Sequence, residues 1–282
     1  MGVPYAEVIG DPIAHSKSPL IHNFWLEKLG IEGEYRRTQV AADALSDYLE
    51  GRRSDPDWRG SNVTTPHKVS IAPLLDELRT LFDIEAVNCV VPNEGRLIGY
   101  NTDASGVGAA IPDGVDTNAP VCIIGAGGAA RAAVAELDMA AVFQFNVIAR
   151  NPEKAGLLVE PYDEFGRVFG FHEAEEAMRG CVGLINASPL GMEGFEPMPD
   201  SVLDSLPLLA PGAFILDMVY VPVRTQLLRR AETVRRGLFR RPLRLVDGLT
   251  MLIGQAEEAF AMFFGQAPPP GYEAELRELL KR

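Results

Sequence analysis

The chain has 282 residues, of which 47% are hydrophobic and 23% charged, and its formal net charge is −13 at pH 7. This length exceeds what one ordinary core needs and predicts two domains in a globular protein. The excess of acidic residues argues against nucleic acid and against an anionic membrane surface as partners, so an anionic ligand needs a local group of cations. No apolar run approaches the roughly 18 residues of a membrane-spanning helix.

The cysteines and the N-terminus predict the cellular setting. Cys89, Cys122 and Cys181 are scattered and lack the spacing of a disulfide framework or of a metal site. The N-terminus has no basic segment followed by an apolar one, as a secretory signal would have. We therefore expect a reduced, cytoplasmic setting and no bound metal.

The first regular segment is a predicted strand over 5–9, followed by a loop that ends at Ser18. Ser18 is a good N-cap with Pro19 behind it, which predicts a helix that Gly30 ends. Ser16 has no role in such a cap. Two hydroxyls at the mouth of a strand–helix turn can bind a polyol or a carboxylate, and the spacing leaves the structural and the ligand-binding interpretations equally open.

Lys68 belongs to GSNVTTPHK (60–68), where a predicted strand runs into a helix expected over 66–75. A cation in the first turn of a helix opposes the helix dipole, so this placement favours a nearby anion over a solvated lysine. A hairpin predicted over 85–100 then places Asp103 at the end of a strand. From spacing alone, Asp103 is better explained as the cap of the helix that follows.

The segment APVCIIGAGGAARAA (119–133) is the centre of the second half of the chain. A wholly apolar strand, 121–124, is followed by G-x-G-x-x-A and then by a helix, which predicts a site for dinucleotide phosphates. A purely structural Gly-rich turn is the weaker alternative. The residues of this turn that we expect to bind the cofactor are Gly125, Ala126, Gly127, Gly128 and Ala129.

The strand predicted over 145–148 indicates which dinucleotide binds. NAD-specific domains usually carry an acidic residue near this point, whereas here Arg150 and, one turn later, Lys154 follow. A guanidinium can bind a 2′-phosphate through two parallel hydrogen bonds, so we expect NADP (NADPH). The alternative is that Arg150 is a solvated charge at a strand end.

Eight motifs together resemble the shikimate dehydrogenase family, and they cover the chain from about Ile9 to Phe264 in the family's order. Several of them have no bearing on dinucleotide binding, so the resemblance goes beyond a general nucleotide-binding fold. The motifs are DPIAHSKSPLIHN, GSNVTTPHK, AVN, GYNTD, GAGGAARA, NASPLGM, DMVYVPVRTQLL and DGLTMLIGQA.

The resemblance implies an α/β fold of two domains separated by a cleft. Residues 1–104 with 250–282 would form the substrate-binding domain around a mostly parallel sheet, and 105–249 a Rossmann-like NADP domain. The implied activity is the reversible, NADPH-dependent reduction of 3-dehydroshikimate to shikimate in aromatic amino-acid (chorismate) biosynthesis. The alternatives are a quinate/shikimate dehydrogenase that uses NAD or NADP and a non-catalytic nucleotide-binding sensor.

The resemblance also implies roles for single residues. Lys68 and Asp103 would form the proton-transfer pair, within hydrogen-bond reach of each other and facing the cofactor, and Ser16 and Ser18 would hold the substrate carboxylate. The further implied substrate-binding residues are Thr64, Asn88, Tyr220 and Gln255, and the further cofactor-binding residues are Ser188, Met192, Met218 and Gly248. The sequence departs from the family at Glu85, Cys89 and Ala149. The expected partners are a small-molecule substrate and no nucleic acid or membrane, in a monomer or homodimer.

Overall fold

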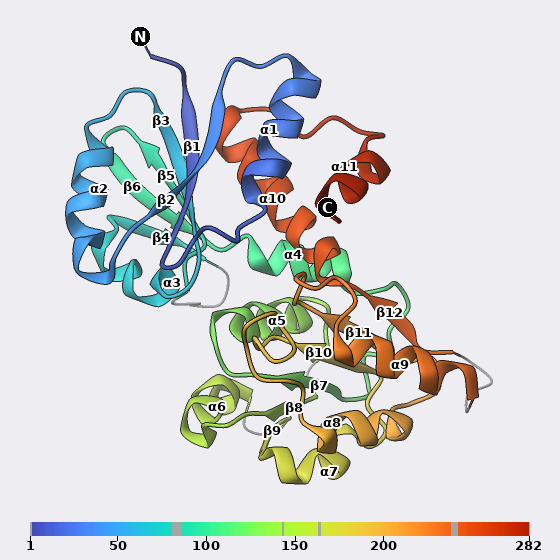
Figure 1. Ribbon diagram of the computed structural model, residues 1–282. Helices are drawn as coiled ribbons and strands as arrows, with labels where there is room; N and C mark the ends of the chain where they lie inside the picture. Colours follow the sequence, from blue (N-terminus) through green and yellow to red (C-terminus); the bar gives the residue numbers. More distant parts are fainter. Residues whose placement is uncertain (1, 81–85, 143, 163–164, 238–241, 282) are drawn as a thin grey trace. The chain divides into compact units, whose positions relative to one another are not determined.

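The computed structural model describes residues 2–80, 86–142, 144–162, 165–237 and 242–281. The chain forms two compact units, Met1–Asp103 with Ile253–Arg282 and Ala104–Leu252. Each unit contains one six-stranded sheet covered by helices, which confirms the predicted α/β class (Figure 1). The assignment of substrate and cofactor roles to the predicted domains remains a prediction, and Glu85 lies outside the described residues.

The sheet of the first unit has the strand order β2-β1-β3-β5-β6-β4. Three neighbouring pairs are parallel, and only the pairs that involve β5 are antiparallel, so the sheet is mostly parallel as predicted. The strands are β1 (Tyr5–Gly10), β2 (Glu34–Gln39), β3 (Trp58–Val63), β4 (Glu77–Arg79), β5 (Cys89–Asn93) and β6 (Arg96–Tyr100).

Helices cover both faces of this sheet, because alternate residues of the buried strand β1 point to opposite sides. Tyr5 and Ile9 pack with Leu45 of α2, whereas Val8 packs with Phe263 of α10. The helices of this unit are α1 (Ser18–Leu29), α2 (Leu45–Arg53), α3 (His67–Ser70) and α11 (Glu273–Leu280), with the last part of α10 (Gly248–Phe264).

Two local predictions in this unit are wrong. Ser18 is the first residue of α1 rather than its N-cap, and it makes no capping bond. The expected helix over 66–75 is reduced to the single turn α3 and the 3-10 turn η2 (Ala72–Leu74), because Pro73 has no backbone N–H to continue the helical ladder.

The sheet of the second unit is entirely parallel, with the order β12-β11-β10-β7-β8-β9. The chain starts at β7 in the middle and builds outward in both directions, as in a doubly wound fold. The strands are β7 (Val121–Ile124), β8 (Phe145–Ile148), β9 (Gly166–Phe169), β10 (Gly183–Asn186), β11 (Phe214–Asp217) and β12 (Arg244–Val246).

Two apolar cores lie on the two faces of this second sheet, one between the sheet and α4, α5 and α6, and the other between the sheet and α7, α8 and α9. In this strand order the chain reverses direction of growth between β7 and β10. The carboxyl ends of β7, β8 and β10 lie at this point, which is where such sheets bind ligands. The helices are α4 (Asp103–Ala110), α5 (Gly128–Met139), α6 (Pro152–Val159), α7 (Ala174–Met178), α8 (Asp200–Ser205) and α9 (Gln226–Gly237).

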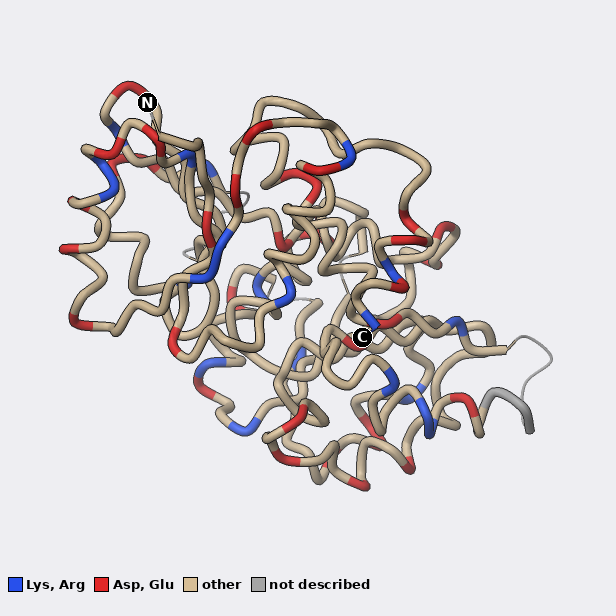
Figure 2. The backbone as a smooth tube through the Cα atoms, turned by 45° about the horizontal axis from the view of Figure 1, so that its top comes forward, with Lys and Arg blue, Asp and Glu red and all other residues tan. Residues whose placement is uncertain are grey.

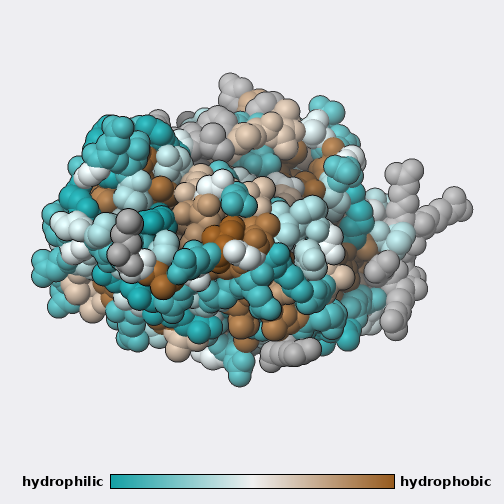
Figure 3. Space-filling model, turned by 90° about the horizontal axis from the view of Figure 1, so that it is seen from above, coloured by the Kyte–Doolittle hydropathy of each residue, from teal (hydrophilic) through white to brown (hydrophobic). Residues whose placement is uncertain are grey.

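Charged residues of both signs are interspersed along the chain (Figure 2). In the basic helix α9 and the turn before it, Arg224 contacts Glu232 and Arg230 contacts Asp204 in exposed ion pairs, while Leu227 and Val234 are buried. The face in Figure 3 is mostly hydrophilic with smaller hydrophobic areas between. Among the described residues, no helix is both long and apolar enough to cross a membrane.

His22 is the buried centre of an aromatic cluster in the first unit. Its ring stacks on Tyr35 with centroids 3.9 Å apart and lies near Trp25 and Phe260. Neither ring nitrogen has a hydrogen-bond partner among the described residues, and burial lowers the pKa of His22 to about 3. The side chain is therefore neutral in the folded state, as expected for a structural histidine.

This cluster predicts a pH-dependent stability difference. Because the folded-state pKa lies below the unfolded value of about 6.5, the unfolded chain binds an extra proton between about pH 3 and 6.5. The stabilisation associated with neutral His22 is complete above about pH 6.5 and falls with decreasing pH, by up to about 1.4 kcal/mol per pH unit. His22→Phe should remove this loss, so urea unfolding at pH 7.5 and at pH 5 should show the variant gaining on the parent in acid.

His172 provides the control, because its side chain is 84% exposed. His172→Phe should keep the pH dependence of the parent. A free-energy difference between the parent and His22→Phe that does not change with pH would refute the assignment.

Candidate active site

Lys68 and Asp103 form an ion pair in the first unit. Lys68 lies in α3 just after β3, and Asp103 begins α4 just after β6. Lys68 Nζ donates to Asp103 Oδ2 over 2.5 Å, and the two side chains are 21% and 7% exposed. The predicted hydrogen bond between Lys68 and Asp103 is therefore present. Asp103 is also the nearby anion that we expected from the position of Lys68 in the first turn of a helix.

Asn88 holds the other oxygen of this carboxylate. Asn88 Nδ2 donates to Asp103 Oδ1 over 2.9 Å and to Thr102 Oγ1 over 3.0 Å, and Asn88 Oδ1 accepts from the backbone N–H of Thr102. The backbone N–H of Asp103 donates to Asn101 Oδ1 over 3.0 Å. Asn88, expected to bind substrate, thus also fixes the orientation of Asp103.

A buried, hydrogen-bonded pair of side chains, Tyr35 and Asn62, lies behind Asn88 and was not predicted from the sequence. Tyr35 donates its hydroxyl to Asn62 Oδ1 over 2.6 Å, and Asn62 Nδ2 donates to the backbone oxygen of Asn88 over 3.2 Å. Asn62 is the amide of the GSNVTTPHK motif, so the motif itself carried a signal for it. Nothing local in the sequence pointed to Tyr35.

Ser16 and Ser18 are buried side by side in the loop between β1 and α1. Ser16 Oγ lies 3.3 Å from Ser18 Oγ and also accepts from the backbone N–H of Ser18. The guanidinium of Arg37 in β2 donates twice to the backbone oxygen of Ser16, at 2.8 and 2.5 Å. Paired hydroxyls near a cation suit a carboxylate ligand.

The other expected substrate residues are placed by their elements. Thr64 follows β3, where its backbone N–H donates to the Ile9 oxygen over 3.0 Å. Gln255 is buried in the part of α10 that belongs to the first unit. Tyr220 follows β11 in the second unit and is half-buried. No described cluster of three or more His, Cys, Asp or Glu side chains could hold a metal ion.

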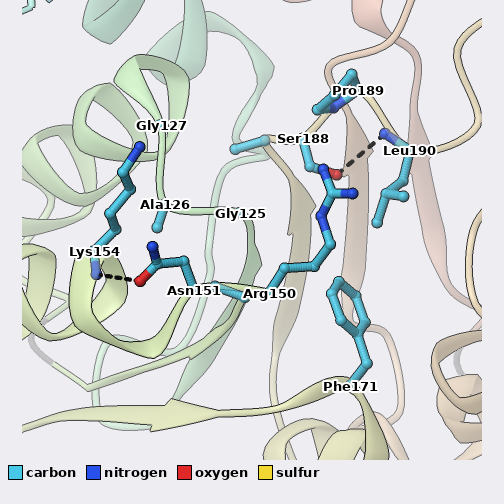
Figure 4. A pocket seen from close by; sticks show the side chains of 12 residues that line it. Gly125, Ala126, Gly127, Arg150, Asn151, Lys154, Phe171, Ser188, Pro189 and Leu190 are labelled. Carbon is cyan, nitrogen blue, oxygen red and sulfur yellow. Dashed lines mark hydrogen bonds between the residues drawn. The ribbon is translucent and has the colours of Figure 1, made fainter. Parts of the chain in front are cut away.

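A pocket of about 240 Å³ lies at the carboxyl ends of β7, β8 and β10 in the second unit (Figure 4). Six of its lining residues were expected to bind the cofactor, whereas Gly128 and Ala129 lie in the first turn of α5. The expected residues in the lining are Gly125, Ala126, Gly127, Arg150, Lys154 and Ser188.

The Gly-rich turn leaves room for a phosphate group. Gly125 has φ +112°, which favours glycine, and a Cβ atom placed on Gly127 would meet no atom within 4 Å. The helix α5 begins here with backbone N–H groups that have no intrahelical partner. Together with the cations Arg150 and Lys154, this donor set fits a phosphorylated dinucleotide.

The pocket also contains residues that the sequence did not single out. Asn151 accepts from the backbone N–H of Lys154 and so caps α6, and Phe171 presents an aromatic ring to the pocket (Figure 4). Phe171 follows β9, and the sequence analysis did not identify that strand. A flat ring at the end of the third strand suits contact with a nucleotide base.

A buried polar network fixes the loops after β10 and β11. Ser188 Oγ donates to Asn186 Oδ1 over 2.7 Å, and Asn186 Nδ2 donates to Asp217 Oδ1 over 2.8 Å. Thr225 Oγ1 donates to Asp217 Oδ2 over 2.6 Å. Burial raises the pKa of Asp217 to about 6, and the hydrogen bonds from Thr225 and Asn186 offset part of this rise.

The three remaining expected cofactor residues lie outside the lining of this pocket. Met192 lies in the loop after β10, and Met218 follows β11. A Cβ atom on Gly248 would lie 2.6 Å from the backbone oxygen of Met218, so glycine allows the start of α10 to approach that strand end. Their contacts with a cofactor remain predictions.

Residues 8–90 match the family model described as the shikimate dehydrogenase substrate binding domain. The chain is 47% identical to the shikimate dehydrogenase (NADP(+)) of Sphingopyxis alaskensis, over 98% of this chain and 97% of that protein. It is 40% identical to the protein of the same name from Paramagnetospirillum magneticum, with 93% of each chain covered.

Solved structures agree with these relatives. The chain is similar to shikimate 5-dehydrogenase from Thermus thermophilus in complex with NADP(H) and shikimate, with 34% identity, a TM-score of 0.80 and 99% of both chains covered. It is also similar to quinate dehydrogenase from Corynebacterium glutamicum in complex with NAD, with 26% identity, a TM-score of 0.80 and 98% of both chains covered. The near-complete coverage at up to 47% identity shows that this chain belongs to the shikimate dehydrogenase family.

Proposed function

We propose that this chain catalyses the reversible, NADPH-dependent reduction of 3-dehydroshikimate to shikimate in aromatic amino-acid biosynthesis. The observation that carries the proposal is the Lys68–Asp103 ion pair, in a chain 47% identical to a protein named shikimate dehydrogenase (NADP(+)). When the purified chain is incubated with shikimate and NADP, the absorbance of the reduced nicotinamide of NADPH should increase with time. Absence of turnover would favour the non-catalytic sensor.

The chemistry needs a cation and a proton at one oxygen. NADPH, held by the Gly-rich turn with Arg150 and Lys154, would supply the hydride for C3, and the carbonyl oxygen would then gain the negative charge of the broken π bond. Lys68 Nζ donates a hydrogen bond to that oxygen, stabilises the developing negative charge and gives it a proton. Asp103 orients the ammonium and compensates its charge, and the neutral amine regains a proton from water.

The substrate and cofactor are held by separate groups of residues. Ser16 and Ser18 bind the substrate carboxylate, and the substrate hydroxyls are bound by Thr64, Asn88 and Gln255, with Tyr220 near the carboxylate. The Gly-rich turn at 125–129 binds the pyrophosphate, Arg150 and Lys154 bind the 2′-phosphate, and the nicotinamide side is bordered by Ser188, Met192, Met218 and Gly248. We propose a cytoplasmic monomer or homodimer.

Lys68 and Asp103 are expected to act as one unit. Lys68→Ala and Asp103→Asn should each lower kcat by roughly 100-fold or more, with a smaller change in KM, because the contact with the oxygen strengthens in the transition state. The double variant should lose much less than the product of the single losses. Steady-state kinetics with shikimate and NADP measure these changes, and fluorescence titration should show nearly unchanged NADP affinity.

The pair Lys28–Glu275 in the same unit, with side chains 25% and 57% exposed, is a matched control, since its removal also deletes a lysine–carboxylate contact. Lys28→Ala should keep the parent kcat. If Lys68→Ala turned over shikimate near the parent rate, Lys68 would be a binding residue only.

Arg150 is expected to determine the choice between NADP and NAD. A charged, bidentate contact contributes about 1.5–3 kcal/mol, so Arg150→Ala should reduce the preference for NADP roughly ten- to a hundredfold. The kcat/KM values for the two cofactors measure this ratio. Arg167→Ala removes a similarly exposed arginine of the same unit, paired with Glu176, and should leave the ratio unchanged. Equal efficiency with NAD and NADP in the parent would contradict the assignment.

Ser16 and Ser18 are expected to exclude quinate, which carries an extra hydroxyl on the carbon that bears the carboxylate. Because the two seryl hydroxyls are buried and only 3.3 Å apart, that group would crowd them. We expect kcat/KM for shikimate to exceed that for quinate by roughly ten- to a hundredfold. Comparable values would place the chain with the quinate/shikimate dehydrogenases.

A further inference from the structure

Arg150, the cation proposed to bind the 2′-phosphate, has an anionic partner within the chain. Arg150 Nη1 lies 2.8 Å from Glu196 Oε2, and both side chains are 68% exposed. Figure 4 shows the guanidinium reaching toward Ser188 and Leu190, whereas Lys154 extends from the opposite side of the pocket. An anion that binds Arg150 therefore meets a carboxylate already in contact with it.

The backbone around Glu196 is held within the loop after β10, and the contact with Arg150 places its carboxylate beside the pocket. The backbone N–H of Gly191 donates to the backbone oxygen of Glu196 over 2.8 Å, and the backbone N–H of Phe195 donates to the backbone oxygen of Met192 over 3.0 Å. The same loop begins with residues 187–190, which line the pocket. Glu196 thus lies at the rim of the proposed cofactor site, 46 residues from Arg150 in sequence.

A carboxylate and a phosphate offer a guanidinium the same kind of charge-assisted acceptor, and both prefer its planar fork. We propose that Glu196 is a specificity-determining residue, whose carboxylate competes with the 2′-phosphate of NADP for Arg150. This inference rests on the proposed role of Arg150 in NADP binding. Because NAD has no 2′-phosphate, the competition lowers the affinity for NADP and leaves the affinity for NAD unchanged.

The test is Glu196→Gln, which keeps the size of the side chain and removes its charge. Exposed ion pairs are weak, so we expect the Kd for NADP to fall about two- to fivefold, with the Kd for NAD unchanged. Calorimetry with 2′-AMP and 5′-AMP gives a readout independent of turnover, and only 2′-AMP should bind more tightly. The gain should diminish at high salt.

Glu193→Gln is the matched control, because Glu193 is an exposed acid of the same loop without an ion pair in the described chain. It should change neither Kd by as much as Glu196→Gln changes that for NADP. In an Arg150→Ala background, Glu196→Gln should lose its effect, since no guanidinium remains to compete for.

The outcomes separate this inference from the cofactor assignment. If Arg150→Ala lowers the NADP preference but Glu196→Gln leaves the Kd for NADP unchanged, only the competition is overturned. An equal gain for NADP and NAD, or the same gain in Glu193→Gln, would also overturn it, because the effect would then be one of net charge. If Arg150→Ala leaves the NADP preference unchanged, the proposed role of Arg150 fails and the competition fails with it.

Discussion

The central constraint in the first unit is that the buried carboxylate of Asp103 needs hydrogen-bond partners for both of its oxygens. An unpaired charge in this position would cost several kcal/mol, so the ion pair and the bond from Asn88 stabilise the unit as well as fixing the orientation of the carboxylate. Lys68 follows the end of β3, Asn88 precedes β5 and Asp103 follows β6. Because β5 is antiparallel to both neighbours, these three strand ends meet at one edge of the sheet.

The sequence predicts what local patterns encode. Apolar runs identify the central strands of the second unit, such as β7 and β10, because strands buried on both faces need no polar alternation. The strand–turn–helix context of the Gly-rich turn likewise predicts the pocket at the ends of these strands. For Asp103, spacing alone favoured a helix cap, and the structure gives it both the first position of α4 and the contact with Lys68.

The rest is carried by contacts between distant segments, which no local pattern encodes. Tyr35 reaches Asn62 across the sheet, and Arg150 reaches Glu196 from another loop. The strand β4 escapes a sequence reading because it is three residues long at the edge of the sheet and two of the three are charged. The N-cap prediction for Ser18 fails by one position, because Lys17 is the N-cap and Ser18 is already the first residue of α1.

The ion pairs Lys68–Asp103 and Arg150–Glu196 differ in how far they are buried, and this difference suits them to different proposed roles. The Lys68–Asp103 pair is mostly buried and further fixed by Asn88, so it holds one geometry, as the transfer of a proton at a defined atom requires. The Arg150–Glu196 pair is exposed and screened by solvent, so its cation can exchange one anion for another at little cost. An ion pair therefore suits the proposed proton transfer where it is mostly buried and the proposed selection between cofactors where it is exposed to water.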